Sequence, residues 1–200
     1  YNRSSKLEAI GKISGVYIPS WYKVRYYPSG ELSNFERIQP EAPEIIQKRI
    51  VPKLPPAPIN LIVPYIDIVH NRAPIEIMRG CTRGCRFCHA GMINRPVRER
   101  SVSEIIKAME EIIPATGYSE IGLLSLSSSD YTNIVKLVEE VNQRFQASGL
   151  FISLPSLRIE SVSVDLMDAL SDQRRSGFTL APEAATPKMR SIINKPISDQ

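Results

Sequence analysis

The stretch "SEIGLLSLSSSDYTNIVKLVEEVNQRFQASGLFISLPS", residues 119–156, decides the fold, because two apolar segments flank one amphipathic segment. The apolar segments, 119–127 and 150–156, are short and nearly continuous, which is typical of strands buried on both faces of a parallel sheet. Asp130 is the expected N-cap of the helix between them. Apolar residues at helical spacing form its expected buried stripe: Ile134, Leu137, Val138, Val141 and Phe145.

The same alternation continues on both sides of this stretch. Residues 74–78 predict an earlier strand, and residues 101–113 predict a helix that buries Ile105, Ile106, Met109, Ile112 and Ile113. A helix is expected around 163–170 and a fourth strand over 176–182. Thr186 and Pro187 then read as the N-cap and first position of a last helix, whose expected inward residues are Met189, Ile192 and Ile193. Four strand–helix units in a row predict an α/β fold with a parallel sheet.

The first 73 residues have a different pattern. Aromatic and β-branched residues on either side of Pro28-Ser29-Gly30 predict a hairpin. Prolines are frequent from Pro40 to Pro64, which excludes long helices and central strands and favours an extended segment that wraps over another surface. We expect no self-contained core here. The sequence therefore predicts a Pro-rich extension over 1–73 and a core domain over 74–200.

Composition is that of an ordinary globular protein, with 42% hydrophobic and 23% charged residues and a net charge of +4. No run approaches the roughly 20 apolar residues of a membrane span, and the N-terminus lacks the apolar core of a signal peptide. We therefore expect no membrane partner and a cytoplasmic location. The three cysteines lie too close together for a disulfide framework, which favours metal-bound thiolates in a reducing compartment.

All three cysteines, Cys81, Cys85 and Cys88, lie in the loop that follows the first predicted strand. Their spacing suits three corners of a [4Fe–4S] cluster and would leave one iron open for chemistry, since the chain has no fourth cysteine. The alternative is a non-catalytic zinc module that uses the three cysteines and His89 for nucleic-acid or protein recognition. That zinc site would be cramped, because His89 directly follows Cys88.

The stretch "EIMRGCTRGCRFCHAGMINRPVRERS", residues 76–101, resembles the radical S-adenosylmethionine (radical SAM) enzymes, and most closely those in which a cobalamin-binding domain precedes the radical domain. The resemblance implies a partial (β/α) barrel in which Cys81, Cys85 and Cys88 hold a [4Fe–4S] cluster. It also implies reductive cleavage of S-adenosylmethionine to a 5′-deoxyadenosyl radical, with an electron donor such as flavodoxin or ferredoxin.

The same resemblance implies contacts to S-adenosylmethionine at the carboxyl ends of the strands. The residues concerned are Phe87 near the adenine, a polar run after the second strand, Arg158 after the third and Glu183 after the fourth; the polar run is Ser127, Ser128, Ser129 and Asp130. Simpler roles remain open for each of them, such as a helix cap for Asp130 or an ion pair with a neighbouring acid for Arg158. No catalytic residue beyond these is indicated.

Two departures from the family qualify the resemblance. The barrel of this family has six strand–helix units, and about four are expected here, so we expect a fragment. The Asp-x-His-x2-Gly loop that binds cobalamin is absent, so cobalamin could enter only through a domain outside this chain.

The substrate is not readable from the sequence. Methyl transfer, methylthio transfer and simple hydrogen abstraction are all open. Six arginines lie between residues 79 and 100, against the single acid Glu99, and they form either an anion-binding rim or a solvated surface. RNA is an open but not favoured substrate, because the arginine-rich stretch over residues 95–100 contains no aromatic residue.

Overall fold

The computed structural model describes residues 2–171 and 178–197. The chain forms two compact units, Tyr1–Pro52 and Lys53–Gln200. The boundary expected between residues 73 and 74 lies inside the second unit. There, Ala57, Ile59 and Leu61 from the Pro-rich segment are partly buried and pack against the main core.

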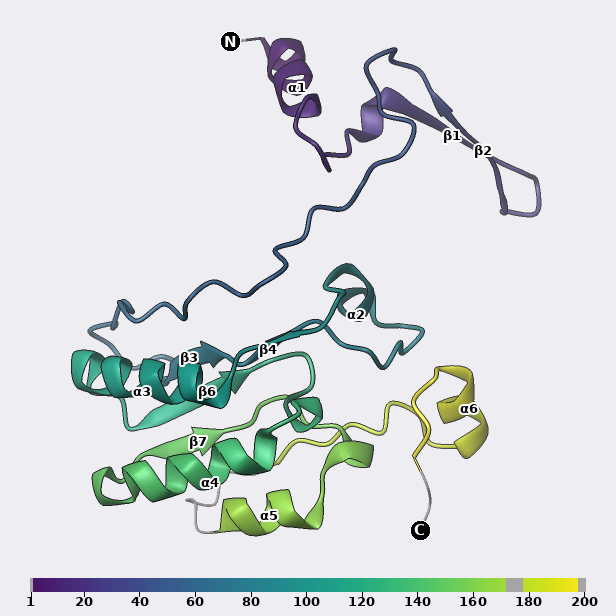
Figure 1. The fold of residues 1–200 in the computed structure, drawn as a ribbon. Helices are drawn as coiled ribbons and strands as arrows, with labels where there is room; N and C mark the ends of the chain where they lie inside the picture. Colours follow the sequence, from purple (N-terminus) through teal and green to yellow (C-terminus); the bar gives the residue numbers. More distant parts are fainter. Residues whose placement is uncertain (1, 172–177, 198–200) are drawn as a thin grey trace. The chain divides into compact units, whose positions relative to one another are not determined.

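A three-stranded parallel sheet forms the centre of the second unit, with strand order β3-β6-β7 (Figure 1). The strands are β3 (Ala73–Glu76), β6 (Glu120–Leu124) and β7 (Phe151–Ser153). Ile75 pairs with Leu123, and Ile121 pairs with Ile152. These strands confirm the parallel sheet and three of the four expected strands. A short antiparallel pair, β4 (Met78–Arg79) with β5 (Arg98–Glu99), extends beyond the end of β3.

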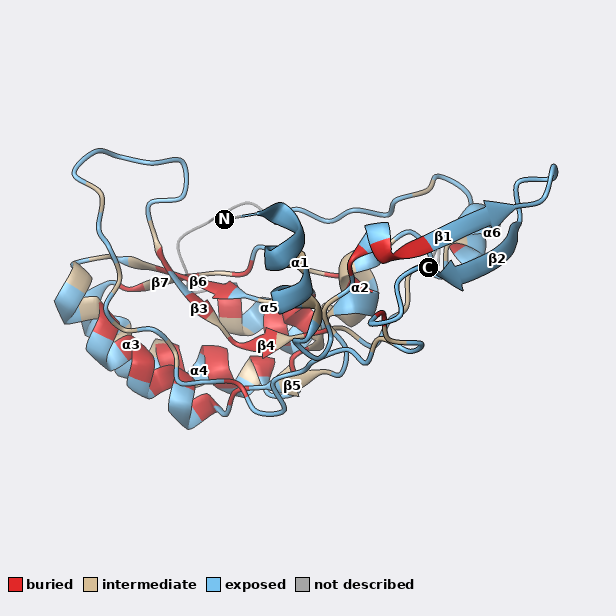
Figure 2. Cartoon of the chain, turned by 90° about the horizontal axis from the view of Figure 1, so that it is seen from above, coloured by how far each residue is buried: buried red, intermediate tan, exposed pale blue. Residues whose placement is uncertain are grey.

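A helix follows each strand of the sheet along the chain, as the alternation predicts. They are α3 (Val102–Thr116), α4 (Ile134–Phe145) and α5 (Val164–Ser171). Figure 2 shows that α3 and α4 each have a buried stripe along one side. The stripe of α3 includes Ile105, Met109 and Ile112, which are fully buried, and that of α4 includes Leu137 and Val138. The expected apolar faces of both helices are therefore confirmed, although Ile113 and Phe145 are only partly buried.

The ends of α3 follow from its sequence. Ser101 and Glu104 form a capping box, in which the Ser101 hydroxyl accepts from the Glu104 amide and the Glu104 carboxylate accepts from the Ser101 amide. The helix ends at Gly117, whose φ of 71° is left-handed. Arg72, just before β3, donates to Glu120, the first residue of β6, and to Ser153, the last residue of β7, and so links all three strands.

Asp130 is not the N-cap of α4, contrary to the prediction. The N-cap is Asn133, and Asp130 lies in the 3-10 helix η2 (Ser128–Asp130). The physical reason is competition for its carboxylate, which accepts hydrogen bonds from Arg83 and from the Ser127 hydroxyl. The Asp130 carboxylate thus binds Arg83 of the cysteine loop instead of capping α4.

The fourth strand expected over 176–182 is wrong for the part that the structure describes. Residues 178–182 have no strand, and residues 176 and 177 lie outside the described residues. Phe178 and Leu180 are 43% and 44% exposed, so they do not provide the burial that holds a strand in a parallel sheet. The Ala181 carbonyl accepts from Lys195 Nζ at 2.5 Å rather than from a ladder amide.

The last helix, α6 (Pro187–Ile192), begins where it was expected but buries another face. Thr186 is the N-cap and accepts from the Met189 amide at 3.3 Å, and Pro187 is the first residue. Met189 and Ile192 were expected to face inward, but they are 47% and 44% exposed, while Arg190 is buried. The Arg190 guanidinium donates to the carbonyls of Ala184 and Ala185, and this selects the face that is buried.

The first unit contains α1 (Arg3–Gly11), η1 (Pro19–Trp21) and the expected hairpin, β1 (Tyr22–Tyr26) with β2 (Leu32–Arg37). Contrary to expectation, it has a small core of its own, made of Ile18, Trp21, Tyr22 and Ala42. Burial of the Trp21 indole and the stack of Tyr22 on Phe35, with ring centres 4.9 Å apart, explain why this short segment holds together. Among the described residues, no helix has the length and apolar character needed to cross a membrane.

Candidate functional site

The three cysteines lie in a tight loop that begins directly after β4. Gly80 and Gly84 have φ of 93° and 69°, a left-handed conformation that favours glycine. A Cβ on Gly80 would lie 2.7 Å from the carbonyl oxygens of both Asn94 and Pro96. The loop therefore passes too close to the segment before β5 to accept a side chain at this position. All three thiols are free and partly buried.

Each cysteine sulfur accepts a hydrogen bond, as suits a thiolate. The Arg83 amide reaches Cys81 Sγ at 3.5 Å, and the Gly91 amide reaches Cys88 Sγ at 3.3 Å. Cys88 is the N-cap of α2 (His89–Ile93). Cys85 Sγ has a charged donor instead, since Arg158 Nη1 lies 3.0 Å away. These donors prepare the loop to stabilise negative charge on sulfur.

The end of α6 clamps this loop through contacts that the sequence did not indicate. Asn194 Nδ2 donates to the carbonyls of Arg83 and Gly84, both at 3.0 Å. Arg86 donates from its side chain to the Ile192 carbonyl at 2.6 Å and from its amide to the Ile193 carbonyl at 2.9 Å. The only local signal in the sequence is that Asn194 tolerates the left-handed conformation it adopts, with φ of 56°.

The arginines around the loop act chiefly as braces. Arg79 forms a fork with Glu76, with distances of 2.6 and 2.7 Å, and the buried Arg100 donates to the Glu76 carbonyl at 3.1 Å. Arg98 donates to the Asn94 carbonyl at 2.8 Å, and Arg95 to the Cys81 carbonyl at 3.4 Å. With Arg83 and Arg86, all six arginines between residues 79 and 100 have a hydrogen bond within the chain. This favours a structural role over a freely available anion-binding rim.

Asp130 joins the end of β6 to the cysteine loop. Its carboxylate receives a fork from Arg83, with Nε at 3.0 Å, and a hydrogen bond from the Ser127 hydroxyl at 2.7 Å. Burial alone would raise the pKa of Asp130, but hydrogen bonds from Arg83, Ser127 and Ser161 outweigh it and lower the pKa. The carboxylate is thus ionised at neutral pH.

The serines before Asp130 are buried, and their hydroxyl groups form hydrogen bonds within the chain. Ser128 Oγ lies within hydrogen-bond reach of the Leu123 carbonyl, at 3.2 Å. Ser129 Oγ shares a hydrogen bond with Ser161 Oγ at 2.8 Å and accepts from the Arg158 amide at 3.0 Å. These contacts hold the residues after β6 against those after β7, which brings Arg158 to the cysteine loop.

Phe87 and Glu183, the two other predicted contacts, are placed less centrally. Phe87 lies within the cysteine loop with its ring 55% exposed. Glu183 has a left-handed φ of 67° and forms an ion pair with Lys195 at 3.2 Å. The structure therefore brings together the cysteine loop, Asp130 and Arg158, whereas the Glu183 carboxylate is held by a residue beyond α6.

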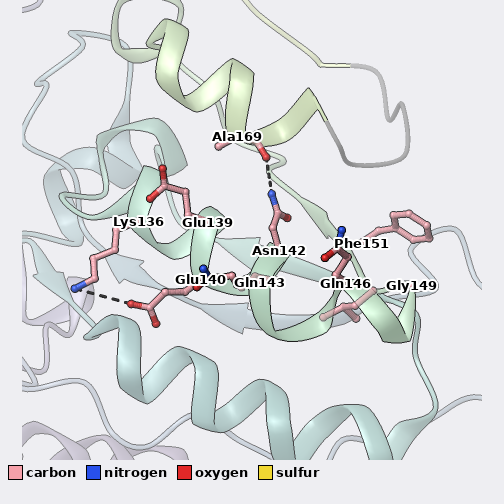
Figure 3. Close-up of a pocket in the computed structure, with 11 residues that line it drawn as sticks. Lys136, Glu139, Glu140, Asn142, Gln143, Gln146, Gly149, Phe151 and Ala169 are labelled. Carbon is pink, nitrogen blue, oxygen red and sulfur yellow. Dashed lines mark hydrogen bonds and ion pairs between the residues drawn. The ribbon is translucent and has the colours of Figure 1, made fainter.

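A small cavity of about 200 Å³ lies beside the loop, and its lining includes Cys81, Thr82, Glu99 and Asp130. A larger hollow of about 720 Å³ lies along α4, near the first residue of β7 (Figure 3). Two contacts join residues of its lining: the Lys136–Glu140 ion pair within α4 and the hydrogen bond from Asn142 to the Ala169 carbonyl. The smaller cavity is the one that adjoins sulfur.

Comparison with known families now decides the assignment. The sequence profile of the Radical SAM superfamily matches residues 75–200, which is more than half of the chain and includes all three cysteines. The chain belongs to the radical SAM superfamily. The resemblance inferred from the cysteine spacing is confirmed, and with it the [4Fe–4S] cluster and S-adenosylmethionine as the cofactors of this family of enzymes.

The chain is also similar in sequence to individual proteins. An uncharacterised protein of Methanocaldococcus jannaschii is 34% identical over 126 residues, which cover 63% of this chain and 27% of the relative. The threonylcarbamoyladenosine tRNA methylthiotransferase of Bacillus subtilis is 27% identical over 106 residues. The matched region covers 50% of this chain and 23% of the relative. The chain thus spans about a quarter of the length of each of these relatives.

A solved structure shares the fold. It is the radical S-adenosylmethionine methyltransferase TsrM from Kitasatospora setae, with cobalamin and a [4Fe–4S] cluster bound. The two structures superpose with a TM-score of 0.53 and 16% sequence identity. The matched region covers 60% of this chain and 24% of the TsrM chain. The likeness supports an α/β fold with a parallel sheet, consistent with part of a radical SAM barrel.

A cluster and a single metal ion place different demands on the three sulfurs. In an iron–sulfur cube each thiolate binds a different iron, so the sulfurs need not surround one point. A zinc ion, by contrast, requires its ligands at about 2.3 Å from one centre. Within residues 2–171 and 178–197, no group of three His, Cys, Asp or Glu side chains is placed to hold one metal ion. His89 is exposed, and the zinc alternative is not favoured.

Proposed function

We propose that this chain binds a [4Fe–4S] cluster through Cys81, Cys85 and Cys88, and S-adenosylmethionine beside it at the ends of β6 and β7. One observation carries the proposal. Within the residues that match the radical SAM profile, the cysteine loop is joined to the residues after β6 by Arg83–Asp130 and to those after β7 by Cys85–Arg158. The carboxyl ends of parallel strands are where ligands bind in such folds.

When bound, the cluster supplies the electron that cleaves the sulfonium of S-adenosylmethionine to give a 5′-deoxyadenosyl radical. The residues of this chain position the reactants. Cys81 and Asp130 line the same small cavity, and the ionised Asp130 carboxylate, together with the Ser127 hydroxyl, is suited to the ammonium group of the methionine moiety. Phe87 is the candidate to cover the adenine, and Glu183 the candidate to contact the ribose.

The relatives narrow the reaction that would follow radical formation. Two activities are found among them, methylthio transfer to tRNA and methyl transfer. These are therefore the proposed reactions for this chain, with tRNA as a candidate substrate. Flavodoxin or ferredoxin is the proposed class of electron donor. A cobalamin contribution would require a domain outside this chain, since the residues that bind it in related proteins have no counterpart here.

Anaerobic reconstitution tests the proposal. The chain, supplied with iron and sulfide, is expected to bind about four of each. With dithionite and S-adenosylmethionine it is expected to release 5′-deoxyadenosine, detected by chromatography and mass spectrometry. Cys85→Ala should lose the cluster, whereas Thr82→Ala, in the same loop but without a sulfur, should retain it. If the chain binds one zinc in place of iron, the proposed cluster is wrong. If a full cluster forms but no 5′-deoxyadenosine is released, the proposed cleavage of S-adenosylmethionine is wrong.

A further inference from the structure

We propose that Arg158 is a positioning residue for the cluster site: Glu160 holds its guanidinium so that it donates a hydrogen bond to Cys85 Sγ, and this contact raises the reduction potential of the bound cluster. The inference rests on the proposed function, because it concerns the same three thiolates. It assigns Arg158 a role different from the contact to S-adenosylmethionine that the sequence suggested.

The Arg158 guanidinium is held in one orientation by its ion pair. Its Nε and Nη2 donate to the two carboxylate oxygens of Glu160 at 3.1 and 2.8 Å. Only 10% of the Arg158 side chain and 20% of the Glu160 side chain are exposed. A forked arginine–carboxylate pair fixes the plane of the guanidinium as well as its position. The remaining nitrogen, Nη1, is therefore directed rather than free to rotate.

The backbone that carries Arg158 is fixed as well. The Arg158 amide donates to Ser129 Oγ at 3.0 Å, and Ser129 Oγ also contacts Ser161 Oγ at 2.8 Å. The Ser128 amide donates to the Ser156 carbonyl at 2.6 Å. Arg158 is thus anchored on both sides to the segment after β6, and its guanidinium reaches Cys85 from a rigid base.

Cys85 differs from the other two cysteines in the kind of donor it receives. Backbone amides serve Cys81 and Cys88 at 3.5 and 3.3 Å, whereas a guanidinium nitrogen lies 3.0 Å from Cys85 Sγ. The guanidinium of an arginine remains protonated in proteins, so the group is cationic. One of the three sulfurs therefore faces a positive charge within hydrogen-bond distance.

The positive charge of Arg158 is expected to raise the reduction potential of the cluster. One-electron reduction adds a negative charge that is shared with the ligand sulfurs, and a cationic donor at a sulfur stabilises the reduced form more than the oxidised form. Because the guanidinium is largely buried, solvent screens this effect less than it would at the surface. Loss of the contact is expected to make the cluster harder to reduce.

The chain contains a matched control for this contact. Arg79 lies next to the cysteine loop and forms the same kind of fork, with Glu76 at 2.6 and 2.7 Å. Its guanidinium donates to the Glu76 carboxylate, whereas that of Arg158 donates both to a carboxylate and to a sulfur. Replacing either arginine by glutamine removes one charge and leaves one glutamate without its partner. Only Arg158→Gln also removes a donor from a sulfur.

The test is an anaerobic redox titration of the reconstituted chain, followed by the electron paramagnetic resonance signal of the reduced cluster. Arg158→Gln is expected to bind as much iron as the unmodified chain but to show a lower midpoint potential, while Arg79→Gln keeps the original midpoint. An unchanged midpoint in Arg158→Gln, or an equal decrease in Arg79→Gln, overturns the inference.

If Arg158→Gln binds no iron while Arg79→Gln does, Arg158→Lys carries the test. Lysine keeps the positive charge, but its ammonium group cannot form the fork with Glu160 that directs the donor to Cys85 Sγ, so the midpoint should decrease by less than a complete loss of the contact would give. An unchanged midpoint in Arg158→Lys then overturns the inference. The two proposals fail separately: an unmodified chain that binds no cluster contradicts the proposed function, whereas a normal cluster with an unaltered midpoint contradicts only the role of Arg158.

Discussion

Replacing Asp130 by asparagine would weaken the connection between the end of β6 and the cysteine loop. In the folded chain the Asp130 carboxylate accepts a fork from Arg83 and a hydrogen bond from Ser127. Its side chain is only 13% exposed, whereas that of Arg83 is 40% exposed. Asparagine keeps the shape and one acceptor oxygen but removes the charge and the second acceptor.

These contacts set the expected loss of stability. A hydrogen bond to a charged group contributes about 1.5–3 kcal/mol, and the exposure of Arg83 places this one at the lower end. Since the asparagine oxygen retains one bond, we expect Asp130→Asn to lower the free energy of unfolding by about 1–2 kcal/mol at pH 7. The pKa of Asp130 is lowered in the folded state, so this stabilisation is present above its unfolded pKa of about 4 and is lost as the pH falls through the folded pKa.

Urea unfolding followed by far-ultraviolet circular dichroism at pH 7 and at lower pH measures this difference. Tryptophan fluorescence is unsuitable, because Trp21 is the only tryptophan and lies in the first unit. Asp168→Asn, at an exposed position of α5, is the matched control and should change stability little. Equal stability of Asp130→Asn and the unmodified chain at pH 7 would refute the reasoning, as would a difference that does not shrink as the pH falls below about 4.

Three further substitutions test other parts of the second unit. Ser101→Ala removes the capping box of α3 and should cost about 1 kcal/mol in urea unfolding, and an unchanged midpoint would contradict this. Tyr131→Phe deprives the Arg100 carbonyl of its 2.8 Å donor and should cost about 1–3 kcal/mol. Because burial raises the pKa of Tyr131 to about 12, a phenolate absorbance titration of this variant should lose the last step and not an earlier one. Gly80→Ala should abolish cluster binding, since its Cβ would meet two carbonyl oxygens at 2.7 Å; Gly30→Ala, also at a left-handed glycine but in open space, should retain it.

The sequence predicted those elements whose apolar residues could be buried in only one way. The stripes of α3 and α4 and the strands β3, β6 and β7 combine the correct period with a core that accepts them. The segment over 178–182 has similar apolar residues, but Phe178 and Leu180 remain exposed in the structure. Local hydrophobicity indicates that a segment can form a strand, whereas pairing depends on partners that the local pattern does not contain.

The candidate site shows the same division. The cysteine spacing was sufficient to predict the family, and the position of Asp130 and Arg158 after strands placed both near the loop. The partners that fix these side chains were not readable, because Asp130 meets Arg83 and Arg158 meets Cys85 across separations of 47 and 73 residues. Asn194 carried no functional signal, since its contacts are to backbone carbonyls that every residue possesses.

The hydrogen bonds from Asn194 to the cysteine loop have a consequence for how the protein matures. They join residues that are 110 and 111 positions apart, with the thiols at the earlier end. During synthesis the cysteines leave the ribosome long before this asparagine does, so the nascent loop lacks its clamp throughout that interval. Iron that arrives after synthesis binds a cysteine loop already held by Asn194, whereas iron that arrives earlier binds a loop without these hydrogen bonds.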